Sequence, residues 1–85
     1  MIITRAHLIK RARHIFKDRW GGYNSKAGVF TSGNYCFDYP LKGISLCEVI
    51  NEGGGLYEVF YAKDNATMLA FLKGIEHGRV NHADK

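Results

Sequence analysis

Apolar side chains recur with helical spacing in a segment near the start of the chain. Between Thr4 and Trp20 they return every three or four positions, and at 100° per residue they fall within one arc of a helix. The members of this stripe are Leu8, Ile9, Ala12, Ile15, Phe16 and Trp20. Thr4 is suited to cap the first turn, and Gly21 and Gly22 are suited to end the helix. The pattern therefore predicts an amphipathic helix that buries one face and exposes the other.

A second helical pattern covers about residues Ala66 to His77, with either Asp64 or Asn65 as its N-cap. Its apolar stripe consists of Met68, Leu69, Leu72 and Ile75, with Phe71 beside it. Gly78 follows this stripe at a position where a glycine commonly ends a helix. The segment therefore predicts a second amphipathic helix near the end of the chain.

Four short runs rich in aromatic and β-branched residues lie between the two helices and are separated by turn residues. They are Val29–Thr31, Tyr35–Tyr39, Ile44–Ile50 and Leu56–Ala62. Loops this short join antiparallel neighbours, so the runs predict a four-stranded β-meander. Neither helix can bury its stripe alone, and the simplest arrangement places both helices on one face of the sheet. We therefore expect one α+β domain in the order α-β-β-β-β-α over residues 1–78, and a polar tail at residues 79–85 that frays.

The hairpin between the second and third strands predicts which side chains share a face. A hairpin symmetric about Leu41 and Lys42 pairs Phe37 with Leu46 on the face toward the helices. The same register pairs Cys36 with Cys47 on the opposite face. The sorting is consistent, with apolar side chains toward the helices and smaller or polar ones away from them.

The last strand has two possible registers, because the glycine-rich loop at residues 53–55 permits either. In one register Tyr57, Val59 and Tyr61 form an aromatic outer surface, and in the other they complete the core. The loop itself lacks the Lys-Ser/Thr pair and the following helix of a Walker phosphate loop. We therefore interpret it as a flexible hairpin connection.

The composition fits a small cytoplasmic domain. With 85 residues, of which 46% are hydrophobic, the chain should bury roughly 60–65% of its unfolded surface around one core. No apolar run approaches the ~20 residues that span a bilayer, and Arg5 interrupts the N-terminal apolar residues before a signal peptide could form. We therefore expect a cytoplasmic location without membrane contact, in which Cys36 and Cys47 stay free thiols.

Positive charge is concentrated in the first predicted helix. The chain has a net charge of +4, and residues 4–20 hold six of its twelve Lys and Arg residues. Arginines outnumber lysines there, and Asp18 is the only acidic residue in the segment. The side chains that point away from the apolar stripe are Lys10, Arg13, His14 and Lys17, with Arg11 on one flank. A cluster of fixed positive charge on a rigid element attracts a phosphate backbone.

We expect this helix to bind nucleic acid, and RNA in particular, with neighbouring aromatic rings available to stack on bases. The predicted binding residues are Lys10, Arg11, Arg13, His14, Lys17, Trp20 and Tyr23. The alternative is a helix surface that is merely solvated, since surface helices are commonly rich in Lys and Arg.

The sequence predicts no catalytic residue, no metal site and no cofactor. Neither CxxC nor HxxxH spacing occurs among the possible ligands, which are His7, His14, His77, His82, Cys36 and Cys47. A cysteine nucleophile needs a histidine beside it, and no histidine lies on the predicted strands. Glu48 and Glu58 could form an acid–base pair across the last two strands, but solvated carboxylates are more common at such positions. We therefore expect a binding protein rather than an enzyme.

In overall character, rather than in any motif, the whole chain is similar to small phage-encoded accessory proteins that inhibit host defence nucleases. Those proteins are short, single-domain, cytoplasmic and without catalytic residues. The resemblance implies an antitoxin-like or anti-defence role, with RNA as a partner and a host nuclease such as an RNA-cutting toxin or a CRISPR effector as the target. Two alternatives remain open. One is a protein-only inhibitor that docks its basic helix on an acidic surface, and the other is a structural homo-oligomer that uses the uncovered face of the sheet.

Overall fold

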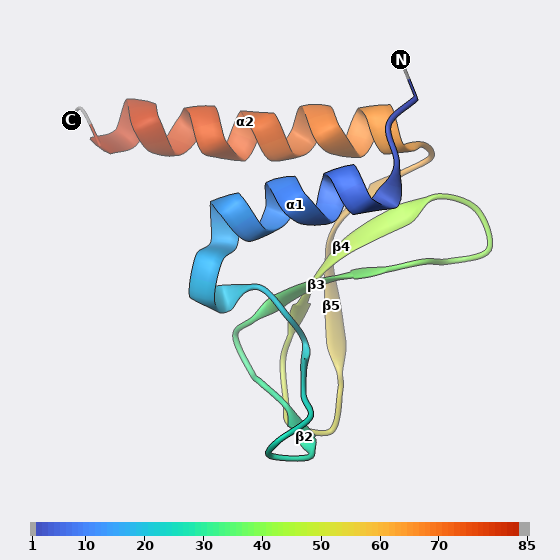
Figure 1. The fold of residues 1–85 in the computed structure, drawn as a ribbon, viewed down its shortest axis with the longest axis vertical. Helices are drawn as coiled ribbons and strands as arrows, with labels where there is room; N and C mark the ends of the chain where they lie inside the picture. Colours follow the sequence, from blue (N-terminus) through green and yellow to red (C-terminus); the bar gives the residue numbers. More distant parts are fainter. Residues whose placement is uncertain (1, 84–85) are drawn as a thin grey trace.

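The computed structural model describes residues 2–83, with side chains as far as Gly78. Its helical elements are α1 (Arg5–Phe16), the 3-10 turn η1 (Lys17–Arg19) and α2 (Asn65–Ala83). Its strands are β1 (Tyr23–Asn24), β2 (Val29–Phe30), β3 (Tyr35–Asp38), β4 (Ile44–Val49) and β5 (Leu56–Ala62). In Figure 1 the helices lie side by side at one end of the molecule, and β2 lies at the opposite end. The fold is α+β, as the sequence predicts.

α1 begins where the sequence predicts and ends earlier. The Thr4 hydroxyl accepts a hydrogen bond from the His7 backbone N–H at 3.2 Å, which confirms Thr4 as the N-cap. The helix ends because Lys17 adopts a left-handed φ of 52° and donates its N–H to the Arg13 carbonyl. The prediction that Trp20 belongs to this helix is therefore wrong, since that residue follows η1 in an extended conformation.

α2 has the predicted start and a later end. Asp64 is its N-cap, because its carboxylate accepts a hydrogen bond from the Thr67 N–H at 2.8 Å, and this bond lowers the pKa of Asp64. Gly78 does not end the helix, which continues to Ala83. A glycine inside a helix costs only about 1 kcal/mol of stability relative to alanine, so a single glycine need not end a helix. Most of the predicted tail is thus helical, and its last two residues, 84 and 85, lie outside the described part of the chain.

β3, β4 and β5 form a three-stranded antiparallel sheet with β4 in the centre. Phe37 lies opposite Leu46, and Cys36 lies opposite Cys47, which confirms the predicted register of this hairpin. Because side chains alternate along a strand, the first pair faces the helices and the cysteines face the other way.

The predicted four-stranded meander is wrong in its first strand. β2 pairs with β1 in a separate two-stranded hairpin instead of joining β3. The Asn24 side chain closes that hairpin, since its Oδ1 accepts hydrogen bonds from the N–H groups of Lys26 and Ala27 at 3.0 and 3.1 Å. The outer edge of β3 is taken by the chain that leaves η1, where the Gly21 N–H donates to the Tyr35 carbonyl at 2.8 Å. The edge of β3 that β2 was predicted to join is therefore occupied.

β5 follows neither of the two predicted registers along its whole length. Phe60 and Glu58 pair with consecutive residues of β4, so that Val59 between them forms a β-bulge. The bulge reverses the alternation of side chains, which places Tyr61 on the face of the cysteines and Tyr57 on the opposite one. All three of the residues whose placement the sequence left open, Tyr57, Val59 and Tyr61, are exposed.

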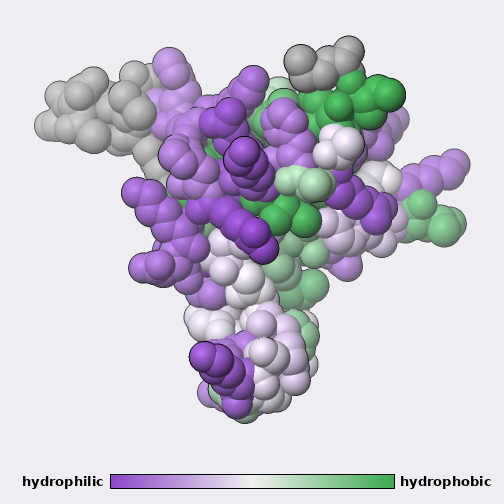
Figure 2. Space-filling view, viewed as in Figure 1, coloured by the Kyte–Doolittle hydropathy of each residue, from purple (hydrophilic) through white to green (hydrophobic). Residues whose placement is uncertain are grey.

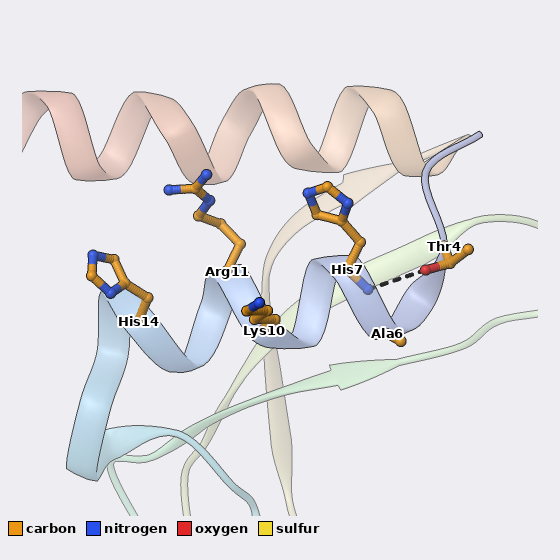
Figure 3. A pocket seen from close by; sticks show the side chains of 6 residues that line it. All are labelled: Thr4, Ala6, His7, Lys10, Arg11 and His14. Atoms are coloured by element: carbon orange, nitrogen blue, oxygen red, sulfur yellow. Dashed lines mark hydrogen bonds between the residues drawn. The ribbon is translucent and has the colours of Figure 1, made fainter. Parts of the chain in front are cut away.

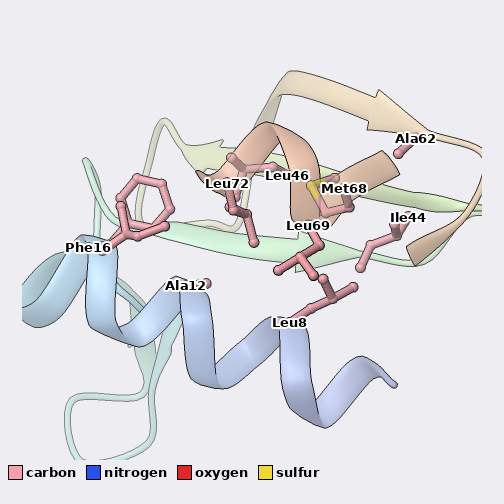
Figure 4. Close-up of a cluster of buried hydrophobic side chains, with 10 residues drawn as sticks. Leu8, Ala12, Phe16, Ile44, Leu46, Ala62, Met68, Leu69 and Leu72 are labelled. Atoms are coloured by element: carbon pink, nitrogen blue, oxygen red, sulfur yellow. The ribbon is translucent and has the colours of Figure 1, made fainter. Parts of the chain in front are cut away.

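Both helices pack on the same face of the sheet and share one core, drawn in Figure 4. Its buried members are Leu8, Ala12, Ile15, Phe16, Ile44, Leu46, Ala62, Met68, Leu69 and Leu72. Aromatic stacking extends the core under each helix. Phe16 of α1 stacks on Tyr35 with ring centroids 4.4 Å apart, and Phe71 of α2 stacks on Phe60 at 3.9 Å. The two predicted apolar stripes are thus confirmed, except that Ile9 is only half-buried and lies outside this cluster.

α1 and α2 run in the same direction (Figure 1). At one end, the Asn65 side-chain amide donates to the Ile3 carbonyl at 2.8 Å. Farther along both helices, the Arg11 guanidinium donates to the Glu76 carboxylate at 3.1 Å. One flank of α1 therefore faces α2 over most of its length.

Phe16→Ala should lower the free energy of unfolding by about 3–5 kcal/mol, because the ring is only 8% exposed and its removal leaves a cavity. Leu41→Ala is the control, since that side chain is fully exposed, and it should change the free energy by less than about 0.5 kcal/mol. Urea denaturation measures both values. A loss below about 1 kcal/mol for Phe16→Ala would contradict the packing of α1 against β3.

Candidate nucleic-acid interface

Three of the predicted binding residues form an exposed strip along α1 and the start of η1, and we call them the basic strip: Lys10 and Arg13 of α1 and Lys17 of η1. The orientation of Lys10 and Arg13 follows from packing, because the burial of Leu8 and Ala12 turns the opposite arc of the helix to solvent. None of the three forms an ion pair with any carboxylate that the structure describes. Figure 2 shows hydrophilic side chains gathered over the region of the two helices. The basic strip therefore presents its charge to solvent.

Two other arginines of the segment are engaged in contacts within the protein. Arg19 donates to the Gly33 carbonyl from Nε and Nη2, at 3.2 and 2.7 Å, and its guanidinium lies 5.2 Å from the centroid of the Tyr35 ring. The Arg5 guanidinium lies 4.0 Å from the centroid of the Tyr39 ring. Two of the arginines that outnumber the lysines in this segment therefore make contacts within the protein.

Arg11 and His14 lie on the flank of α1 that faces α2, and both contact one carboxylate. Arg11 Nη1 lies 3.1 Å from Glu76 Oε1, and His14 Nε2 lies 3.3 Å from Glu76 Oε2. The side chains of Arg11 and Glu76 are each 34% exposed, so this pair is partly screened from water. These two predicted residues therefore belong to a contact between the helices rather than to the basic strip.

Two grooves adjoin this contact. One, of about 610 Å³, runs along α1 and is lined by Thr4, Ala6, His7, Lys10, Arg11 and His14. Figure 3 shows the side chains of His7, Arg11 and His14 pointing toward α2. The other, of about 410 Å³, is lined by Arg11, Lys73, Glu76 and His77. Because Arg11 lines both, the grooves meet at that residue, and we call them together the helix seam.

The two predicted aromatic residues lie apart from these grooves. Trp20 is half-buried and packs on the core, with its ring centroid 4.9 Å from that of Phe37 and 6.0 Å from that of Phe16. Tyr23 is exposed on β1, where it pairs with Phe30 in the small hairpin, away from the helices. The structure thus gives Trp20 a packing role and does not bring Tyr23 to the basic residues of α1.

Several residues of the helix seam do not belong to the predicted site. His7 precedes Arg11 by four residues and His14 by seven, a spacing that places all three on one flank of a helix. That signal was available from the sequence. Lys73 and Glu76 join them only because α2 lies alongside α1, which a pattern read along one helix cannot show.

The cysteines are poorly suited to nucleophilic chemistry. Both are free thiols, and Cys47 is only 3% exposed. Burial raises the pKa of Cys36, and burial together with the neighbouring thiol and carboxylates raises the pKa of Cys47 to about 11. At neutral pH both side chains are therefore neutral thiols, whereas a nucleophile needs the thiolate.

The structure also separates the two glutamates that the sequence suggested as an acid–base pair. Glu48 lies opposite Tyr57, while Glu58 lies opposite Cys47 and accepts a hydrogen bond of 2.6 Å from the Ser45 hydroxyl. Adjacent positions on β4 face opposite sides, so the two carboxylates do not share a site. Among the described residues, no three His, Cys, Asp or Glu side chains are grouped so that they could hold a metal ion.

Comparisons with protein-family models, curated proteins and solved structures find no match to this chain. Within residues 2–83, neither helix combines the length and apolar character that crossing a membrane requires. The chemical character of the site therefore rests on its own side chains.

Lys17→Gly should raise the free energy of unfolding by about 1 kcal/mol, because glycine has no Cβ atom and adopts a positive φ without a steric clash. The observed φ of 52° and ψ of −119° are strained for lysine. Lys17→Ala removes the same charge but keeps a Cβ atom, so it should give no such gain. If thermal unfolding found Lys17→Gly less stable than Lys17→Ala, the conformation at the end of α1 would be wrong.

Cys47 should resist alkylation in the folded protein. Its raised pKa of about 11 and its 3% exposure leave little accessible thiolate. Labelling with iodoacetamide near pH 8, followed by peptide mass spectrometry, should be at least about 100-fold slower for Cys47 in the folded protein than in the urea-unfolded one. Equal rates in the two states would contradict the placement of this residue in the centre of the sheet.

Proposed function

We propose that this protein is a non-enzymatic RNA-binding protein that holds a phosphate backbone against α1. The observation that carries the proposal is the basic strip of Lys10, Arg13 and Lys17, whose charges have no ion-pair partner among the described residues. Because α1 is fixed by the core, the backbone positions of Lys10 and Arg13 are set before a ligand arrives. Binding a polyanion then requires little ordering of the protein backbone.

The spacing of the strip suits a short stretch of one nucleic-acid strand. Lys10 and Arg13 are about 4.5 Å apart along the helix axis, at 1.5 Å per residue, and Lys17 follows at the start of η1. The adjoining groove adds His7 and His14, whose ring nitrogens can donate hydrogen bonds to phosphate oxygens or to a ribose hydroxyl. A flexible single strand can follow such a surface more closely than a stiff duplex, which favours single-stranded RNA as the ligand.

In a cell, such a protein would act by occupying RNA that another enzyme must engage. A host nuclease, such as an RNA-cutting toxin or a CRISPR effector, is the class of target that we propose. This part of the proposal is motivated by the similarity in overall character to phage accessory proteins that inhibit defence nucleases.

A second candidate function is inhibition through protein contact alone. The observation that favours it is the set of exposed apolar and aromatic side chains on β5, Tyr57, Val59 and Tyr61, since tyrosine is enriched at protein interfaces. In this alternative the basic strip meets an acidic patch of the target. A homo-oligomer that uses the uncovered face of the sheet would contact Tyr61, which lies on the face of the cysteines, and light scattering would identify it from the molar mass.

Reversing the charge of the basic strip tests the proposal. Lys10, Arg13 and Lys17→Glu should abolish binding of fluorescently labelled single-stranded RNA, measured by anisotropy at about 50 mM salt, while the protein stays folded. Each lost phosphate contact should also reduce the slope of log affinity against log salt by about 0.7, so neutral Gln substitutions at the three positions should reduce it by about 2.

The matched control is Lys26, Lys42 and Lys63→Glu, which changes the net charge equally at three exposed positions outside α1 and η1. This control should retain RNA binding with only a modest loss from the long-range field. Equal losses in the two triple variants would mean that net charge alone drives binding. An unmodified protein that binds no RNA at about 50 mM salt would reject the proposal and favour the protein-only alternative.

A further inference from the structure

The helix seam contains a cationic surface that adjoins the basic strip at Lys10. Its described lining residues with positive or titratable nitrogen side chains are His7, Lys10, Arg11, His14, Lys73 and His77. Glu76 is the one carboxylate among the described residues that line it. The cations come from both helices, so a ligand in the seam would contact α1 and α2 together.

Glu76 already occupies the position of an anion in this seam. Its two oxygens are divided between two partners, with Oε1 at 3.1 Å from Arg11 and Oε2 at 3.3 Å from His14. A phosphate group presents oxygens in a similar way, and a guanidinium binds both kinds of group. Arg11 donates to Glu76 through Nη1 alone among its described contacts, so that its other N–H groups can reach a second anion.

The dimensions of the seam fit a nucleic-acid strand. The grooves of about 610 and 410 Å³ are each large enough for part of a nucleotide, and they meet at Arg11. Lys10 belongs both to the larger groove and to the basic strip, so that the two surfaces are continuous. A strand that contacts the strip can therefore pass into the seam.

We propose that RNA bound by this protein passes through the helix seam, where a backbone phosphate displaces the Glu76 carboxylate from Arg11 and His14. Glu76 is thus an internal competitor that weakens RNA binding, and Lys73 of α2 is a binding residue. This inference rests on the proposed function, because it specifies the path of the RNA over the same region of the protein.

Glu76→Gln tests the competition directly. Removing the carboxylate charge while keeping the shape should tighten binding of single-stranded RNA by about 5-fold or more, and should steepen its salt dependence, because a phosphate no longer competes with a fixed anion. Glu52→Gln is the matched control, since it removes one negative charge from an exposed position in the β4–β5 loop. It should tighten binding by less than about 2-fold.

Lys73→Gln tests the participation of α2. It should weaken binding by about 3-fold or more, whereas Lys63→Gln, at an exposed position just before α2, should have a smaller effect. Circular dichroism and thermal unfolding establish that each variant folds, and anisotropy with the same labelled RNA measures all four.

The results separate this inference from the function on which it rests. Tighter binding by Glu76→Gln together with weaker binding by Lys73→Gln would support the path through the seam. If Glu76→Gln and Lys73→Gln bind like their controls while Arg13→Gln binds more weakly, RNA lies on the basic strip alone and the inference is wrong although the proposed function stands. If the unmodified protein binds no RNA, both are overturned.

Discussion

The burial of one stripe of α1 against α2 and β4 determines how every basic residue of that helix is presented. Leu8 and Ala12 are fully buried, and Phe16 stacks on β3 at the end of the helix. These contacts fix the rotation of α1 about its own axis, because turning the helix would expose the apolar stripe to water. The consequence is a division of the basic side chains into an outward group on the basic strip and a flank that faces α2.

The outward group and the flank differ in their electrostatic environment. Lys10 and Arg13 face water, where salt screens their charge and a polyanion gains by releasing counterions. Arg11 and His14 lie beside a partly buried carboxylate, where interactions between charges are less screened. A ligand that uses both surfaces would gain on-rate from the first and specificity from the second, since an anion that enters the flank would compete with Glu76 for Arg11 and His14.

The sequence predicted both apolar stripes, the N-cap at Thr4 and the pairing of Cys36 with Cys47, because each depends on residues near one another in the chain. It did not predict that the chain after η1 occupies the edge of β3, or that a bulge at Val59 reverses the alternation of β5. The first depends on a segment distant in the sequence that takes the hydrogen-bonding groups of β3, and the second is a local irregularity that leaves no mark in the pattern of residues. The candidate site shows the same limit, because the contributions of α2 to the helix seam depend on how two helices pack, which no pattern along either one contains.

The central claim is that an RNA strand lies over α1 and the seam with α2. Chemical-shift mapping tests it most directly: a uniformly ¹⁵N-labelled sample is titrated with a single-stranded oligouridylate of about ten nucleotides, a length within the usual range for single-strand binding sites. The account predicts that the backbone amides that shift belong to residues 7–17 of α1 and 73–77 of α2. Shifts confined to β5 and the sheet, or no shifts at low salt, would contradict it.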